Sequence, residues 1–430
     1  MLMASIATTP ASPPAPAPAP SNPGVPSSVR LHSPRRFAVL GAGFAGVSLA
    51  WHLLQHTSSS GPVSVDLFDE AGIGGGASGV SGGLLHPYTP KGKLLWKGSE
   101  GWQAALSLLA AAEEAAALHR RDSKPIAWRR GILRPLVAEK HVKNARKLGS
   151  GDGLGTGLAG IQCLERPQAH AMVPGLELPE NGLGLYIPGG INLHPRFYLE
   201  ALWLACEDFA HNAGSGTHAA LVRQRVSSLA EISREGYEAV IVCAGSKAVL
   251  LPELAGKLPL SMCRGVVAHL ELPSEYDGYD SQAPNLLTHT WLAIQGAREM
   301  VLGATKDWNS EAECGDVSAE EGILVQDELL QRAAQFYPLI KQWEVKSLRA
   351  GVRAMPPRTP LGSLPLAGCV NKLVQPLQSE TQWWMIGGLG SRGLIYHGWL
   401  GERVAAAVTA QDASLIPHEL NQFGAVLAQV

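Results

Sequence analysis

Glycines at a fixed spacing near the start of the chain could bind the pyrophosphate of a dinucleotide. The segment GAGFAG follows a short apolar stretch and holds Gly41, Gly43 and Gly46 in the pattern GxGxxG. In this pattern the first glycine permits a tight turn and the second lets the backbone approach a pyrophosphate, while the third allows close helix–strand packing. Phe44 and Ala45 would open a helix whose free amides favour phosphate. The alternative is a glycine turn that only packs.

Two acidic residues follow the next apolar segment, Val63–Phe68, which reads as the second parallel strand. In a strand–turn–helix–strand unit, a carboxylate at the end of this strand binds the ribose hydroxyls of the dinucleotide. We expect Asp69 to have this role, with Glu70 as the alternative. NAD and FAD share these features, so the choice between them depends on other segments.

Two further glycine-rich segments favour FAD. Small residues in GGASGVSGGLL (75–85) would let a flat isoalloxazine ring lie against the main chain. Near the other end of the chain, GGLGSRGL (387–394) predicts a turn and a helix start, whose dipole would stabilise the flavin edge that becomes negative on reduction. An ordinary helix cap is the alternative for this late turn. The cofactor residues predicted here are Ala77, Ser78, Gly83, Leu84, Gly390, Ser391, Arg392, Gly393 and Leu394.

The elements around these motifs predict an α/β fold. Apolar patterns predict strands at 37–40, 63–68, 128–137, 237–243, 260–272, 299–304 and 383–386, and helices at 45–55, 99–121, 195–211, 319–336 and 392–410. We predict a discontinuous Rossmann-like FAD-binding domain (37–125, 161–250 and 350–412) with an inserted antiparallel-sheet α+β substrate domain (126–160 and 251–349). Residues 413–430 would form a C-terminal tail.

The first 36 residues differ in composition from the rest. No Asp or Glu precedes Asp66, whereas Arg30, Arg35 and Arg36 accompany many Ser, Ala and Pro residues. An acid-free, hydroxylated and basic leader predicts a transit peptide and a location in the plastid stroma. The alternative is a disordered tail without targeting function, which would leave the protein in the cytoplasm.

The remaining composition excludes several function classes. The six cysteines show no CxxC spacing, so no metal site or disulfide framework is predicted. The uncharged run Phe37–Leu54 is better explained by a strand, a turn and a helix than by a membrane span, so no membrane partner is expected. A net charge of −2 argues against a general nucleic-acid binder.

The chain resembles the D-amino-acid oxidase/glycine oxidase superfamily of FAD enzymes. The resemblance is carried by GAGFAG, GASG followed by GGLLHP, LPLSMCRGVV (258–267), GVRAMPPRTPLGSLPLAG (351–368) and GLGSRGL, which together span most of residues 37–410. Within the superfamily it is most similar to the C-terminal oxidase half of the bacterial bifunctional enzyme that makes 5-methylaminomethyl-2-thiouridine in tRNA. Val80, Gly82 and the TPLGSLP run depart from that enzyme's pattern, and its methyltransferase half is absent.

The resemblance implies oxidation of a C–N bond, with hydride transfer to flavin N5 and O2 as electron acceptor. It implies non-covalent FAD, because no cysteine follows Val352-Arg353, and it places Val226, Ala244 and Gly245 at the adenosine. A substrate carboxylate would need an arginine, and Arg353 and Arg264 are the candidates, each with a structural salt bridge as the alternative.

Three histidine and tyrosine positions have weaker assignments. His86 and Tyr88 could line the substrate face or simply pack, whereas His194 is expected to start a helix.

The substrate itself stays open at this point. Carboxymethylaminomethyl-uridine at the tRNA wobble position is one candidate, and a basic cluster of Lys91, Lys93 and Lys97 with Trp96 could meet RNA unless these lysines are only solvated. A small free amino acid or secondary amine is the alternative. A flavin-binding protein without turnover is the third interpretation, and the sequence leaves the oligomeric state undetermined.

Overall fold

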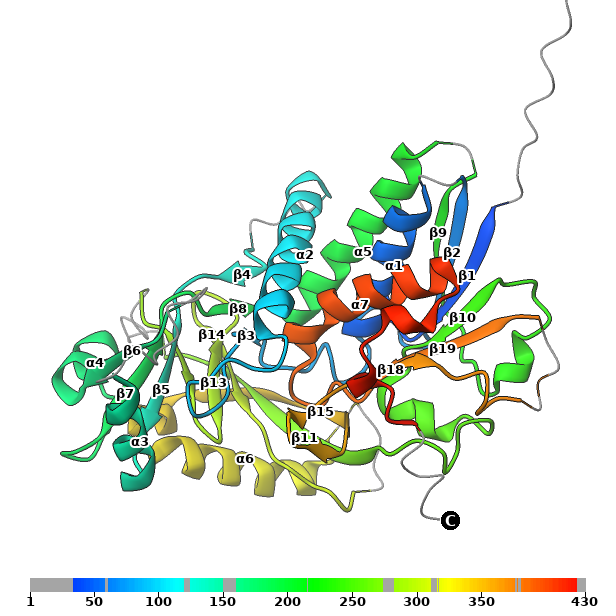
Figure 1. Ribbon diagram of the computed structural model, residues 1–430. Helices are drawn as coiled ribbons and strands as arrows, with labels where there is room; N and C mark the ends of the chain where they lie inside the picture. The colour runs from blue at the N-terminus through cyan, green and yellow to red at the C-terminus, as the bar shows by residue number, and fades with distance from the viewer. Residues whose placement is uncertain are drawn as a thin grey trace, which may run out of the picture. The chain divides into compact units, whose positions relative to one another are not determined.

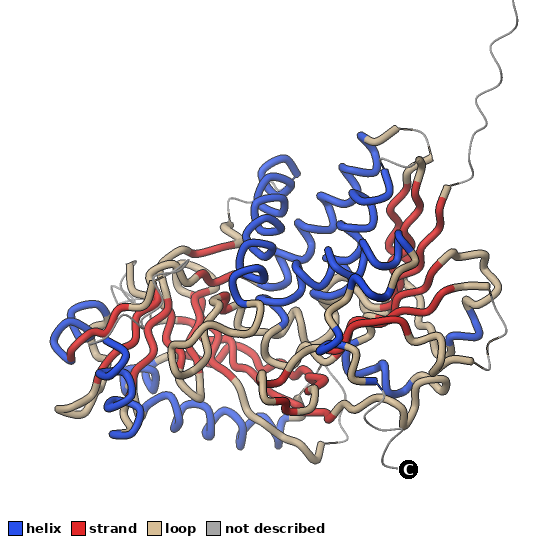
Figure 2. The backbone as a smooth tube through the Cα atoms, viewed as in Figure 1, coloured by secondary structure: helices blue, strands red, loops and turns tan. Residues whose placement is uncertain are grey.

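The computed structural model describes residues 34–58, 61–119, 124–149, 160–214, 216–273, 282–310, 315, 317–375, 377 and 380–423 (Figures 1 and 2). Most of the predicted leader, the segment 150–159 and the last residues of the predicted tail lie outside these ranges.

A six-stranded sheet carries the first glycine motif at the end of its central strand. Its order is β18-β19-β10-β1-β2-β9, and every pair is parallel except β18 with β19. The strands are β1 (Arg35–Leu40), β2 (Val63–Phe68), β9 (His218–Val222), β10 (Ala239–Val242), β18 (Leu366–Cys369) and β19 (Gln382–Gly387). Near-continuous apolar runs such as those of β1 and β10 are typical of parallel strands buried on both faces.

Four helices pack together on one face of this sheet (Figure 1). They are α1 (Phe44–Ser58), α2 (Gly98–His119), α5 (Pro195–Asn212) and α7 (Gly393–Ala410). The start of α5 is set by His194, whose side chain accepts a hydrogen bond from Phe197 N, and by Pro195 at the first helical position. The expectation that His194 starts a helix is therefore confirmed.

A second, eight-stranded sheet has the order β15-β11-β14-β13-β12-β5-β7-β6 and is mostly antiparallel. Its strands are β5 (Ile132–Leu136), β6 (Gln162–Glu165), β7 (Leu183–Ile187), β11 (Ser261–Glu271), β12 (Asn285–Leu287), β13 (Trp291–Ile294), β14 (Glu299–Gly303) and β15 (Glu344–Met355). Helix α6 (Ala319–Ala334) covers one face with buried Val325, Leu329 and Ala333. Ser318 caps α6, since its hydroxyl accepts a hydrogen bond from Glu321 N.

Smaller elements complete the described part. A three-stranded sheet joins β3 (Leu84–Leu85), β8 (Ile191–Leu193) and β4 (Ala127–Trp128), and β16 (Arg358–Thr359) pairs with β17 (Gly362–Ser363). Helices α3 (Glu139–Gly149) and α4 (Arg166–Met172) lie beside β6 and β7. None of the helices in the described ranges combines the length and the apolar character needed to cross a membrane.

The structure corrects two predicted boundaries. Strand β1 begins at Arg35, two residues before its predicted start at Phe37, and Arg35 pairs with Glu238 of the same compact body. The predicted FAD-binding segment 161–250 contributes β6 and β7 to the large sheet instead, because both strands hydrogen-bond within it. The predicted strand at 128–137 is divided between β4 and β5, which belong to different sheets.

Candidate functional site

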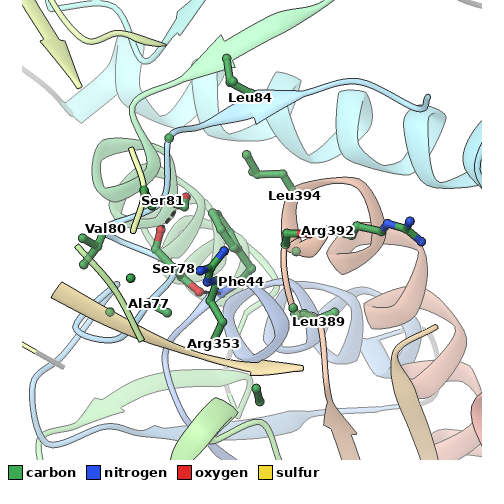
Figure 3. A pocket seen from close by; sticks show the side chains of 18 of the residues that line it. Phe44, Ala77, Ser78, Val80, Ser81, Leu84, Arg353, Leu389, Arg392 and Leu394 are labelled. Atoms are coloured by element: carbon green, nitrogen blue, oxygen red, sulfur yellow. Dashed lines mark hydrogen bonds between the residues drawn. The ribbon is translucent and has the colours of Figure 1, made fainter. Parts of the chain in front are cut away.

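A cavity of about 1450 Å³ is lined by residues of both sheets and of the loops between them. It collects predicted residues from both ends of the chain, from Gly41 to Leu394. The predicted cofactor residues at its wall are Gly41, Gly43, Phe44, Ala45, Asp69, Glu70, Ala77, Ser78, Gly83, Leu84, Val226, Ala244, Gly245, Gly390, Ser391, Arg392, Gly393 and Leu394. Figure 3 shows Phe44, Ala77 and Ser78 around the same space as Leu389 and Leu394 of the late turn.

The turn between β1 and α1 requires glycine at two positions. Gly41 has a φ of +108°, and a Cβ there would lie 2.5 Å from the carbonyl oxygen of Cys243 on the neighbouring strand. A Cβ on Gly46 would collide with the carbonyl oxygen of Gly41. Gly46 does not line the cavity; it lets α1 approach the turn, the packing role expected of the third glycine.

The first turn of α1 presents polar groups to the cavity. Ser78 Oγ accepts a hydrogen bond of 3.1 Å from Phe44 N, which ties the GASG loop to the helix start (Figure 3). Within the described residues, the amides of Gly43 and Ala45 have no recorded acceptor, and both residues line the cavity. Free amides at a helix N-terminus, next to a hydroxyl that can still donate, form an anion-binding site.

The two predicted ribose carboxylates have different surroundings. The Asp69 carboxylate accepts hydrogen bonds from Ala42 N (2.8 Å), Ala71 N (2.9 Å) and Gly72 N (2.9 Å), which hold the loop after β2. A carboxylate offers about four acceptor sites, so roughly one remains for a ligand. Glu70 is paired with Lys247, whose hydrogen bond lowers the pKa of the Glu70 carboxyl.

The late glycine turn completes the cofactor end of the cavity. Gly388 and Gly390 have positive φ angles, and helix α7 starts at Gly393 with Arg392 as its N-cap. The Arg392 side chain donates to the carbonyl of Ser363 at 3.3 Å and points away from Phe44 and Ser78 in Figure 3. Strands β1 and β19 run in the same direction in one sheet, so α1 and α7 both start at its carboxyl edge. The N-termini of both helices therefore face the cavity.

The family model described as "FAD dependent oxidoreductase" (DAO) matches residues 36–407. The chain belongs to this family of FAD-dependent oxidoreductases. It is therefore an enzyme with FAD as its cofactor. No curated protein matched the chain.

Solved structures share the fold of this FAD-dependent oxidoreductase. Iminodiacetate oxidase from Chelativorans sp. BNC1 is 21% identical with a TM-score of 0.64, covering 89% of this chain and 98% of that one. Glycine oxidase from Geobacillus kaustophilus is 22% identical with a TM-score of 0.64, covering 88% and 95%. L-Proline dehydrogenase from P. horikoshii is 14% identical with a TM-score of 0.67, covering 92% and 99%.

The cavity of this oxidoreductase fits FAD. Its pyrophosphate would lie against the amides of Gly43 and Ala45 beside Ser78, where a Cβ on Gly43 would meet Ser78 Oγ at 2.8 Å. Val226, Ala244 and Gly245 lie beside Glu70 and Lys247, at the wall expected to hold the adenosine. The isoalloxazine would extend toward the late turn, since Gly390–Leu394 line the same cavity.

The two candidate arginines separate in the structure. Arg353 on β15 lines the cavity, and its Nη2 makes only contacts of 3.4 Å to Cys263 Sγ and to the carbonyl of Thr305. Within the described residues it has no carboxylate partner. Figure 3 shows its guanidinium directed toward the region of Phe44 and Ser78.

The prediction that Arg264 binds a substrate carboxylate is wrong. Its side chain is 5% exposed and makes a bidentate ion pair with Glu321 at the start of α6. Side chains alternate along β11, so Gly265 and Val267 line the cavity while Arg264 shares the α6 face with Val266. Its alternative, a structural salt bridge, is what the structure contains.

His86 lines the cavity as a neutral side chain. Burial lowers its pKa to about 3, helped by the nearby charges of Arg134 and Arg392. Its Nδ1 accepts a hydrogen bond of 3.2 Å from Tyr88 N, which assigns the ring proton to Nε2. His86 can therefore donate a hydrogen bond from Nε2, and it is unsuited to be a general base.

The predicted basic–aromatic cluster has internal contacts of its own. Trp96 packs edge-on against Trp399 with ring centroids 5.6 Å apart, and Lys97 pairs with Glu100 at 2.8 Å. Lys91 alone of these residues lines the cavity. Trp96 is partly buried and packs against the hydrophobic core, which leaves only part of its surface accessible.

Several cavity residues were not predicted, including Arg134 on β5, Trp291 on β13 and the pair Arg225 and Lys247. The available signal for Arg134 was one charged residue in the apolar run ILRPL, which by itself also fits an exposed strand position. Among the described residues, no group of three or more His, Cys, Asp or Glu side chains could hold a metal ion.

Proposed function

We propose that this FAD-dependent oxidoreductase oxidises the C–N bond of an amine or amino-acid-like substrate. The observation that carries the proposal is Arg353, a cavity-facing guanidinium without a carboxylate partner among the described residues, on the wall where the late turn would hold the flavin. An arginine of this kind is suited to bind a carboxylate with two parallel hydrogen bonds. The names of the structural neighbours, glycine oxidase, iminodiacetate oxidase and L-proline dehydrogenase, support the same class of substrate.

The residues of the chain act on such a substrate by positioning it. Bound FAD supplies the hydride acceptor at its N5 atom. Arg353 would hold the substrate carboxylate, and His86 Nε2–H would donate a hydrogen bond from the opposite loop. Among the described residues, no carboxylate lines this part of the cavity, and its histidines are His86, His141 and His289. The amine would enter in its neutral form, and positioning would contribute most to catalysis.

The identity of the substrate within this class is also a proposal. Carboxymethylaminomethyl-uridine in tRNA contains a carboxylate that Arg353 could bind, and the GASG and GLGSRGL motifs favour the tRNA-modifying oxidases. The packing of Trp96 against Trp399 favours a free amino acid or secondary amine instead. We therefore place the small amine first and the tRNA nucleotide second.

A flavin-reduction experiment tests both proposals. The full-length protein is purified, its flavin absorbance is recorded, and glycine, sarcosine, proline and a modified anticodon stem-loop are added under exclusion of oxygen. Bleaching by one class identifies the substrate, and readmission of air with peroxide release identifies O2 as acceptor. Bound flavin that no amine reduces would contradict the proposal and favour a binding protein without turnover.

Two associated proposals need separate tests. Release of the flavin by acid precipitation would support non-covalent binding, and flavin retained in the pellet would contradict it. Residues 1–33 fused to a fluorescent reporter would enter plastids if this leader is a transit peptide, and a cytoplasmic signal would contradict that proposal.

A further inference from the structure

A second arginine faces the cavity from β5. Arg134 lies in the run Ile132–Leu136, in which Leu133 and Leu136 are buried in the apolar core. Arg134 lines the cavity together with His86, which is close enough for the arginine charge to lower its pKa. Across the described residues, the Arg134 guanidinium has no hydrogen bond and no carboxylate partner.

A largely buried cation without a counter-charge is costly. Burial alone lowers the pKa of Arg134 to about 10, and no acidic group is among the causes of this shift. The side chain therefore stays charged at neutral pH, partly buried at the cavity wall and without an ion-pair partner among the described residues. An anion that enters the cavity would supply the missing partner.

The charges on the cavity wall are divided between its two ends. Among the described lining residues, the only carboxylates are Asp69 and Glu70, and both are already engaged at the adenosine end. Lys91, Arg134, Lys306, Arg353 and Arg392 line the remainder. This part of the cavity thus favours a ligand with more than one negative charge.

Arg353 and Arg134, which have no carboxylate partner among the described residues, lie on strands that are far apart in the large sheet. Strand β5 is five positions from β15 in the order β15-β11-β14-β13-β12-β5. At about 4.8 Å per strand, this separation is on the order of 24 Å along the sheet. The pyrophosphate of FAD would be bound by the N-terminus of α1, which follows β1 of the six-stranded sheet. The pyrophosphate therefore does not supply the missing partner of Arg134.

We propose that Arg134 binds a second anionic group of the substrate, so that the substrate is an amine with an acidic group at each end. This inference rests on the proposed function, in which Arg353 binds one acidic group of the substrate. The C–N bond that is oxidised lies next to that group. The distal group is a carboxylate or a phosphate, which the guanidinium would bind in the same way. Arg134 would then select long diacidic amines over amines with a single acid.

A series of N-(ω-carboxyalkyl)glycines with increasing chain length tests this inference. Each compound is compared with its terminal carboxamide, which has nearly the same size and no distal charge. In the wild-type full-length enzyme we expect kcat/KM for the carboxylate to exceed that for the carboxamide by about 10- to 100-fold at one preferred length. A parallel series with terminal phosphonates distinguishes a carboxylate site from a phosphate site.

Arg134→Met should lower the carboxylate-to-carboxamide ratio to about one while changing kcat/KM for the carboxamide less than threefold. Arg129→Met is the control, because Arg129 is an exposed arginine paired with Glu113, and it should leave the ratio unchanged. Arg134→Lys, which keeps a charge, should retain part of the ratio. A ratio near one in the wild type, or a high ratio that survives Arg134→Met, would overturn the inference.

Two further measurements separate failure of this inference from failure of the proposed function. If no amine is oxidised, titration of the flavin absorbance with straight-chain dicarboxylates still measures anion binding in the wild type and in Arg134→Met. Equal dissociation constants in both would overturn the role of Arg134. Loss of bound FAD from a folded Arg134→Gln variant would also overturn it, since the residue would then belong to the cofactor site.

Discussion

The two ends of the cavity are built by different means. Around the start of α1, the predicted contacts are main-chain amides and a single hydroxyl, and the essential residues are glycines that allow close approach. On the large sheet, the contacts are side-chain charges such as Arg353 and Arg134. A backbone site requires a local sequence pattern, whereas a side-chain site requires only that distant strands bring the right groups together.

The charges show the same contrast. At the adenosine end, Glu70 is paired with Lys247 and Asp69 is bonded to three amides, so the protein satisfies its own polar groups. On the large sheet, Arg353 and Arg134 have no carboxylate partner among the described residues. The comparison indicates that the first end holds a ligand by shape and that the second end selects a ligand by charge.

The largest effect is expected at the backbone end. Gly41→Ala would place a Cβ against the Cys243 carbonyl in a backbone region that L-residues disfavour. We expect the purified variant to contain less than about a tenth of the wild-type flavin, measured by absorbance at equal protein concentration. Gly214→Ala is the matched control, with a φ of +91° but no neighbouring atom within 4 Å of the added Cβ. Equal flavin loss in both variants would attribute the effect to general strain.

The second prediction concerns the charged end. Arg353→Met should leave the flavin content unchanged and lower kcat/KM for a carboxylate-bearing amine by about 100-fold, since a bidentate charged contact is lost. Arg349→Met is the control, because Arg349 is exposed on the same strand and lies outside the cavity. A decrease in kcat/KM of less than threefold for Arg353→Met would show that Arg353 on β15 does not bind the substrate carboxylate.

The third prediction separates Arg264 from Arg353. Arg264→Met leaves Glu321 without its partner and should lower the free energy of unfolding by about 1–3 kcal/mol, with kcat/KM within threefold of the wild type. Thermal unfolding and steady-state kinetics measure the two effects. Arg264→Met combined with Glu321→Gln should recover part of the stability. Loss of substrate affinity without loss of stability would contradict the structural role of Arg264 and indicate that it binds substrate.

The smallest effect on activity is expected at His86. Its pKa of about 3 means that the ring stays neutral from pH 5 to 9, so His86→Gln should not shift the pH profile of kcat/KM. A pKa lowered from 6.5 means that the unfolded chain binds a proton that the folded chain does not. The contribution of His86 to stability therefore falls as pH decreases from about 6.5 toward 3.

Denaturant unfolding at pH 8 and pH 5 measures this contribution. The variant should lose less stability between the two pH values than the wild type does. A shift of the kinetic pH profile near neutrality would show that His86 titrates during turnover and would contradict the neutral assignment.

Local patterns predicted the fold well where consecutive residues carried the signal. Strand β2 has the predicted limits, and α1, α5, α6 and α7 were expected within a few residues of their observed ends. Strand β15 was missed, because its exposed half mixes charged and apolar residues and its partner β11 lies about 80 positions earlier in the chain. The assignment of β6 and β7 was wrong for the same reason, since pairing across a sheet is not a local property.

For the site, the sequence by itself determined the FAD end, because Gly41 and the late turn adopt backbone angles that favour glycine and Gly46 must fit against the nearby Gly41 carbonyl. Only the tertiary structure decided which arginines face the cavity. Arg264 and Arg353 occur in equally distinctive motifs, yet one points to Glu321 and the other to the ligand space. Side chains alternate along a strand, so strand register and the neighbouring elements decide which face each arginine occupies.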